Sequence, residues 1–369
     1  MILKNTLIGL LLLWSCSIAT AQISSGGLPV SFETPGLKTK IQKVTMPAIP
    51  LDDLIREDEL LDASDNPYRF GYLFEVDYSL ENAGQWETLS DGSKLWRLQI
   101  ECPGALSINL NYSDFELPRG AKLFIYNEDR SDVIGAFTHE NNKPYRKFST
   151  IPVRGDRIIL EYHEPRKTYK PGTIRIDGIV HGYRNIHEAL AKSGSCNLDV
   201  VCGAGDGFPE VDNWRDQIRS VVALFTPGNI GFCTGALINN TNLDCTPYIL
   251  TARHCGFGTP NVSDNNLFIF NYENSFCRQP NSTASGQAGN GSLAQSISGM
   301  TVIATSGGGG GIQISDFALI ELSAQPPTSY NAHYAGWSRS NLAPSGAVAI
   351  HHPSVDEKRI VFKTDSLFI

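Results

Sequence analysis

The sequence predicts an all-β protein in which a β-sandwich is followed by an antiparallel β-barrel. Short runs of alternating apolar and polar residues, separated by Gly, Pro, Asn and Asp turns, recur from Tyr68 to about His163, which is typical of a sandwich. After Lys192 glycine and serine become more frequent, cysteines cluster, and strands recur without helical runs between them. This second pattern favours a closed barrel and places a domain boundary near Lys192.

The first residues have the pattern of a secretory signal peptide. Lys4 supplies a positive start, Leu7–Ala19 is a short apolar run, and the small residues around Ala21 match a cleavage site. We expect residues 1–21 to be removed and the mature protein to be secreted, either outside the cell or into the periplasm. The alternative, a lipid-attachment box at Leu13–Cys16, fits poorly because a bulky Trp precedes its small residue. No later stretch has the roughly 20 apolar residues that a membrane-spanning helix needs.

Residues 22–192 divide into three parts. A leader arm, residues 22–65, is rich in Pro, Gly and charge and carries one short predicted helix, Leu51–Leu61. Residues 66–163 form the predicted sandwich, with strands at Phe70–Val76, Leu95–Ile100, Ile108–Leu110, Lys122–Tyr126 and Arg157–Tyr162. Residues 164–192 are predicted to be a linker that contains a strand-like run, Thr173–Val180, and a short helix around Ile186–Lys192.

The second half is predicted to hold one barrel and the start of another. Strands are expected at Ile218–Phe225, Phe232–Ile238, Tyr248–Ala252, Leu267–Tyr272, Met300–Ala304 and Phe317–Leu322. We assign residues 193–325 to the first barrel and residues 326–369 to the beginning of an incomplete second one.

Cysteine usage supports export. Apart from Cys16 there are seven cysteines, and six of them lie between Cys196 and Cys277, a density that indicates disulfides in an oxidising compartment. A zinc site is the alternative, but no pair has the Cys-x-x-Cys spacing that such sites usually show. The formal charge of −8 is mild and the basic residues form no stripe, so neither nucleic acid nor an anionic membrane surface is an expected partner.

Two segments carry the strongest chemical signal, Gly231–Ile238 (GFCTGALI) and Tyr248–Cys255 (YILTARHC). The pair resembles the strand and the histidine turn of chymotrypsin-like peptidases. Further segments look like the bacterial lysyl endopeptidases, namely residues 194–202, 271–278, 315–322, 349–353 and 357–360. The resemblance covers residues 193–363 almost continuously. It implies a trypsin-like serine endopeptidase that acts on proteins or peptides and needs no cofactor.

By that resemblance His254 is the general base and Asp316 is the acid that orients it. A serine hydroxyl is a weak nucleophile until an imidazole takes its proton, and a carboxylate fixes the tautomer and stabilises the imidazolium. The alternatives are a structural histidine beside a disulfide for His254, and a turn residue before an apolar strand for Asp316.

The catalytic serine expected beside His254 and Asp316 is not found in the sequence. In this family the chain order is His, Asp, then Ser, and a Gly-x-Ser-Gly loop should follow Asp316, since its N–H groups form the oxyanion hole. Ser306 lies on the wrong side of Asp316, and neither Ser345 nor Ser354 has glycine on both sides. We therefore expect the 369 residues to lack the nucleophile and to be inactive as they stand.

The resemblance also implies two disulfides, Cys233–Cys255 and Cys202–Cys277. The family partner of Cys196 would lie beyond Ile369, so a Cys196–Cys245 bond and two free thiols are both open. The pair His351–His352 could indicate a metal, but adjacent residues on a strand point to opposite faces, which favours a structural role and no metal site.

Lysine distribution gives one hint about specificity. Residues 1–192 contain 11 Lys and 11 Arg, and residues 193–369 contain 2 Lys and 6 Arg. A peptidase that cuts after lysine resists self-digestion when it has few lysines of its own. Maturation is expected between Lys192 and Ser193.

The sandwich is then interpreted as a pro-domain, an intramolecular partner that helps the barrel to fold, holds it inactive, or both. The competing hypothesis is a secreted, non-enzymatic β-rich binding protein or a pseudopeptidase.

Overall fold

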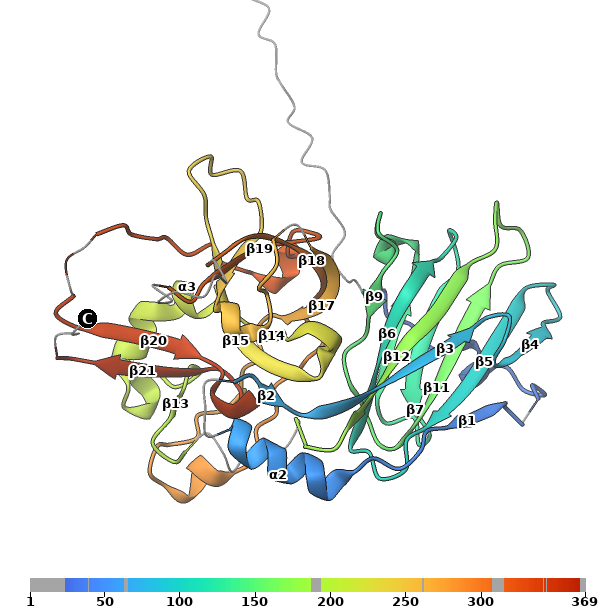
Figure 1. Cartoon of the computed structure of the whole chain (residues 1–369), viewed down its shortest axis with the longest axis horizontal. Coiled ribbons are helices and arrows are strands. Elements are labelled where there is room, and N and C mark those ends of the chain that lie inside the picture. The colour runs from blue at the N-terminus through green and yellow to red at the C-terminus, as the bar shows by residue number, and fades with distance from the viewer. Residues whose placement is uncertain are drawn as a thin grey trace, which may run out of the picture.

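A computed structural model describes residues 24–38, 40–62, 66–186, 194–260, 262–306, 315–340, 342 and 344–365. The expected signal peptide, residues 1–21, and the expected maturation pair, Lys192 and Ser193, lie outside these described residues. The chain is mostly β, which confirms the predicted class. A sandwich and a barrel lie side by side, and α2 runs along the edge that they share (Figure 1).

Helices are few and short in the described residues. They are α1 (Val30–Glu33), α2 (Leu51–Leu61) and α3 (Arg215–Ile218), with 3-10 turns at His139–Asn141, Ala204–Asp206, Pro209–Trp214, Pro227–Asn229, Arg253–Cys255, Thr283–Gly286, Thr328–Tyr330 and Pro353–Val355. The bounds of α2 are those predicted from the sequence. Its first turn carries Asp52 and Asp53, whose charges favour the positive end of the helix dipole. None of the helices described here is long and apolar enough to cross a membrane.

Two sheets form the sandwich. The first has the order β1 (Lys43–Thr45), β5 (Lys94–Glu101), β11 (Arg157–Glu164), β7 (Lys122–Asn127), β8 (Val133–Phe137), with β4 (Gln85–Thr88) also on β5. The second has the order β10 (Val153–Arg154), β6 (Ser107–Glu116), β12 (Thr173–Gly182), β3 (Gly71–Ser79), with β9 (Phe148–Ser149) on β6. Side chains that alternate inward from both sheets, such as Leu98 and Leu110, build one buried core.

The sandwich takes up more of the chain than residues 66–163. The run expected in the linker, Thr173–Val180, is the core of β12, which lies between β6 and β3. Its inward residues Ile174, Ile176 and Ile179 are buried, so the second sheet would have an open apolar centre without them. The leader arm also contributes, because β1 pairs in parallel with β5.

The barrel is closed and has six strands. Its order is β14 (Val221–Phe225), β17 (Ser263–Ile269), β18 (Ser296–Thr305), β19 (Ala318–Leu322), β16 (Tyr248–Thr251), β15 (Gly231–Ile238), and β15 pairs back with β14. All six strands differ from the predicted bounds by at least one residue, and two of the differences have a clear local cause. The run expected from Ile218 begins only at Val221, since Ile218 ends α3. The run expected to reach Tyr272 ends at Ile269, because Asn271 has a left-handed backbone with φ 50°.

A small third sheet joins the two ends of the C-terminal half. It has the order β13 (Leu198–Asp199), β21 (Arg359–Lys363), β20 (Ala347–His351). β20 and β21 lie in residues 326–369, the stretch assigned to a second barrel, whereas Tyr330 and Ala335 of the same stretch contact the first barrel. Buried ion pairs connect this sheet to Arg278 and stabilise it. The fully buried guanidinium of Arg278 contacts Asp199 at 2.9 Å and Glu357 at 2.9 Å, while Arg359 contacts Asp199 at 2.8 Å and Asp356 at 2.5 Å.

Sandwich and barrel contact each other through both apolar and polar side chains. Phe70 and Val180 of the N-terminal half share a buried cluster with Phe225 of the barrel. Asn229 donates to Asn111 Oδ1 at 2.7 Å and to Ser149 Oγ at 2.9 Å, and Asn265 donates to Ser149 Oγ at 2.6 Å. Lys147 forms an ion pair with Asp264 at 3.3 Å nearby. A two-residue strand of the N-terminal half, β2 (Tyr68–Arg69), also pairs with β15 of the barrel.

Candidate active site

The position of His254 follows from the strand that precedes it. β16 pairs with β15 up to Leu250, and after Thr251 the chain leaves the sheet in the 3-10 turn Arg253–Cys255. The Thr251 hydroxyl ties this departure to β15 by donating to the carbonyl of Thr234 at 2.8 Å. Gly256 then ends the turn with a left-handed backbone, φ 94°, which glycine adopts without steric cost.

Asp316 is brought to His254 by the pairing of β16 with β19. Thr251 lies opposite Ala318, so the residues just past the end of β16 face those just before β19. His254 Nδ1 lies 2.5 Å from Asp316 Oδ2, and the backbone N–H of His254 donates to Oδ1 of the same carboxylate at 3.0 Å. Because a carboxylate only accepts, the Nδ1–H donates, which leaves Nε2 free to take a proton.

Both side chains of the pair are open to solvent. The exposed fraction is 42% for His254 and 44% for Asp316, so the carboxylate is half-exposed rather than buried as in the usual triad. The hydrogen bond from the His254 side chain, helped by the backbone N–H, lowers the pKa of Asp316 below its ordinary value. The carboxylate is therefore ionised at neutral pH and holds the imidazole in one orientation.

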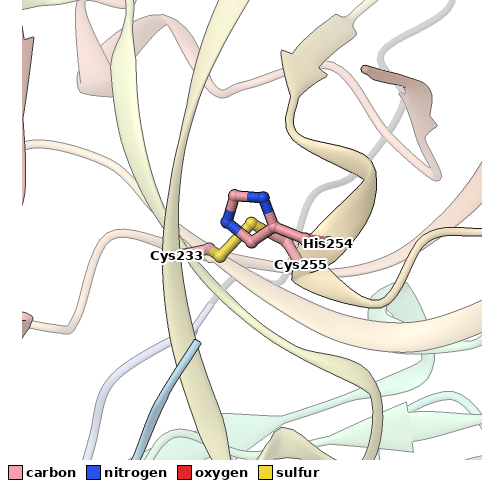
Figure 2. A group of neighbouring side chains, drawn as sticks. All are labelled: Cys233, His254 and Cys255. Atoms are coloured by element: carbon pink, nitrogen blue, oxygen red, sulfur yellow. A yellow bond between two sulfur atoms is a disulfide. The ribbon is translucent and has the colours of Figure 1, made fainter. Parts of the chain in front are cut away.

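A disulfide lies directly beneath the imidazole. Cys233 on β15 is bonded to Cys255, with a Cα–Cα distance of 6.2 Å, and the ring of His254 lies over the S–S bond (Figure 2). Sulfur and ring nitrogen atoms of these three residues come within 4.8 Å of one another, but both sulfurs are consumed by the disulfide and offer no thiolate to a metal.

The structure also gives the state of the other described cysteines, including the two whose pairing the sequence left open. Cys202 is bonded to Cys277 with a Cα–Cα distance of 4.8 Å, the second pair implied by the family resemblance. Cys196 and Cys245 are exposed free thiols and are not bonded to each other, while Cys102 is free and buried in the sandwich core.

The remaining candidates fall outside the His–Asp pair. Ser345 precedes β20, and Ser354 lies in the 3-10 turn that follows it. His352 is buried, donates from Nδ1 to the carbonyl oxygen of Asp356 at 3.1 Å and stacks on Tyr272, a set of contacts that fits a structural histidine.

One element near the site could not be found from the sequence. Tyr68 and Arg69 of β2 pair with Phe232 and Gly231, the two residues of β15 that precede Cys233. A pairing of two residues across more than 160 positions has no local signature, and only the Pro at position 67, typical of an edge strand, points to it.

The fold and the site together define the class. A closed six-stranded antiparallel barrel that holds a His–Asp pair over a disulfide is the arrangement expected of the first half of a chymotrypsin-like peptidase.

Comparison with known proteins narrows the class. Residues 190–368 match the family model described as lysyl endopeptidase, C-terminal domain. Over 305 residues the chain is 28% identical to the lysyl endopeptidase of Pseudomonas aeruginosa, an alignment that covers 74% of this chain and 59% of that relative. The chain thus spans less than two thirds of the relative's length. It is lysyl endopeptidase-like and related to proteases, as the resemblance implied.

Proposed function

We propose that the chain is the precursor of a secreted, trypsin-like serine endopeptidase, with His254 as general base and Asp316 as its orienting acid. The observation that carries the proposal is that the carboxylate of Asp316 accepts two hydrogen bonds from His254, one from the ring and one from the backbone N–H. An imidazole with its Nδ1 held and its Nε2 free is prepared to accept a proton from a hydroxyl.

The reaction then follows from these two residues. A serine hydroxyl placed at Nε2 of His254 would lose its proton to the ring as it attacks a peptide carbonyl, and the ring would return that proton to the leaving amine. Asp316 would stabilise the imidazolium in between. The serine and the oxyanion hole belong to a Gly-x-Ser-Gly segment, which does not follow Asp316 in these 369 residues.

We further propose that the complete enzyme cuts after lysine and matures between Lys192 and Ser193. The fall in lysine after residue 192 and the name of the similar Pseudomonas aeruginosa protein support this specificity. The N-terminal apolar run and the two disulfides support export into an oxidising compartment. In this proposal residues 22–192, with the sandwich, are the pro-region.

The decisive test compares the 369-residue chain with a version extended through a Gly-x-Ser-Gly segment. We expect the short chain to leave ester and peptide substrates intact and the long one to cleave them after lysine. In the long version Asp316→Asn should lower kcat by about 10⁴-fold, since the wrong tautomer is then favoured.

The matched control is His139→Ala in the sandwich, compared with His254→Ala. The first should leave the rate of hydrolysis unchanged and the second should abolish it. Hydrolysis by the short chain that is lost on replacing Ser345 or Ser354 would contradict the proposed nucleophile. An extended, folded chain with no hydrolytic activity would favour a binding protein.

A further inference from the structure

One edge of β15 is only partly covered by the other strands of the barrel. On one side β15 is covered by β14, which pairs with Phe232–Ala236. On the other side β16 pairs only with Ala236–Ile238, because β16 leaves the sheet for the His254 turn. Gly231 and Phe232 therefore lie on a stretch of edge that β16 does not reach, and an unpaired edge is a template for another extended chain.

β2 fills this stretch of edge. Tyr68 lies opposite Phe232 and Arg69 opposite Gly231 in antiparallel register, and the N–H of Phe70 donates to the carbonyl of Ile230 at 2.8 Å. Main-chain pairing of this kind is how sheet edges bind extended peptides. The edge thus binds β2 through backbone hydrogen bonds.

The paired strand begins one residue from the disulfide-bonded Cys233. Cys233 directly follows Phe232, and its sulfur lies within 4.8 Å of a ring nitrogen of His254. Because the pairing is antiparallel, the residues before Tyr68, namely Pro67 and Asn66, continue in the direction of Cys233. A chain bound to this edge therefore runs toward the residue of β15 whose disulfide lies beneath the imidazole.

Contacts within the N-terminal half hold β2 in place. Arg69 donates to the buried carboxylate of Asp58 on α2 at 2.8 Å, and Tyr183 donates to the other oxygen of that carboxylate at 2.8 Å. The guanidinium of Arg184 lies 3.7 Å from the centre of the Tyr68 ring and donates to the carbonyl of Arg69 at 3.0 Å.

One anchor reaches the barrel itself. The side chain of Phe70 is fully buried and packs edge-on against Phe225 of β14, with ring centroids 5.4 Å apart. The polar side chains of Asp58, Tyr183 and Arg184, which fix β2, all belong to residues before Lys192. The N-terminal half therefore holds the backbone of β2 in the conformation in which it pairs with β15.

We propose that the Gly231–Phe232 edge of β15 is a docking surface for one extended peptide strand, and that residues 66–70 of the same chain are its occupant in the precursor. This occupant keeps other peptides from the side of the barrel that carries His254. The biological meaning rests on the proposed peptidase function, whereas the docking itself does not.

The test measures binding of a probe peptide to the full 369-residue chain. The probe is the acetylated, fluorescein-labelled peptide Asn-Pro-Tyr-Arg-Phe-Gly, which has the sequence of residues 66–71. Arg69→Glu places a carboxylate beside Asp58 and Glu57, which Arg69 now neutralises, and should release β2 from the edge. The matched control is Arg56→Glu, an exposed position on α2 where the arginine forms an ion pair with Asp53.

We expect the Arg69→Glu chain to bind the probe at least tenfold more tightly than the wild-type and Arg56→Glu chains, whose edge is occupied. A folded Arg69→Glu chain that binds no better than wild type would overturn the proposal. Equal tight binding by the wild-type chain would overturn it as well.

A second measurement needs no variant. In the wild-type chain, hydrogen exchange at the amide of Phe70 should be slowed at least a hundredfold relative to an unstructured peptide, since this amide is bonded to the barrel. Exchange at the unstructured rate would refute the docking even if Arg69→Glu fails to fold. Neither measurement requires hydrolysis, so an inactive extended chain would refute the proposed function and leave the docking result standing.

Discussion

Acid should destabilise the barrel through one buried histidine, His352. Burial, reinforced by the nearby charge of Lys358, lowers the pKa of His352 to about 3. In the unfolded chain its pKa is the ordinary value of 6.5. Between these two values the unfolded chain binds a proton that the folded chain does not, so the free energy of unfolding falls as the pH falls.

The size of this effect follows from the two pKa values. Each pH unit in the window costs about 1.4 kcal/mol, so lowering the pH from 7.5 to 5 should remove about 2 kcal/mol. The loss continues until the pH approaches 3. A change of this size is a large fraction of the stability of an ordinary domain.

The assay compares wild type with His352→Asn, which keeps an N–H donor for the carbonyl of Asp356 but cannot take a proton. Urea titrations at pH 7.5 and 5, read by hydrogen exchange in barrel strands, give the free energy of unfolding of each. Other groups that titrate, including Glu357, whose pKa is raised by burial, cancel in the difference. Parallel pH profiles for the two proteins would refute the reasoning.

Two further predictions concern the C-terminal half. Replacing Cys233 and Cys255 with serine should lower the free energy of unfolding by about 3 kcal/mol, and mass spectrometry of unreduced wild-type peptides should recover this pair together with Cys202–Cys277. In the extended, active precursor, Lys192→Arg should slow maturation because a guanidinium is broader than an ammonium. N-terminal sequencing of the mature wild-type protein should begin at Ser193. Maturation of the Lys192→Arg variant at the normal rate would count against lysine specificity.

Local patterns in the sequence were enough where strands pair through alternating side chains. The bounds of α2 agree with those predicted, and β7 and β11 begin at the predicted residues, since regular periodicity is a property of the segment itself. Prediction was less accurate where the fold overrides a segment's own pattern. The sequence places the strand-like run Thr173–Val180 in a linker, and only the sheet shows that it lies between β6 and β3.

The candidate site could be predicted only through family resemblance. His254 and Asp316 are 62 residues apart, and nothing local to either requires the other; they meet because β16 and β19 are neighbours in the barrel. The free thiols at Cys196 and Cys245 and the docking of β2 were beyond sequence reasoning for a related reason. Each depends on which distant segments the fold brings together.

The third sheet can form only late in synthesis, because its buried ion pairs join residues that are far apart in the chain. Asp199 stands near the start of the C-terminal half, and its partner Arg359 is made 160 residues later, so at usual elongation rates the ribosome needs on the order of ten seconds or more to supply it. Throughout that interval β13 has no neighbour in its sheet, while all strands of the sandwich have already been made. The N-terminal half can therefore be complete before the first strand of the C-terminal half finds its place.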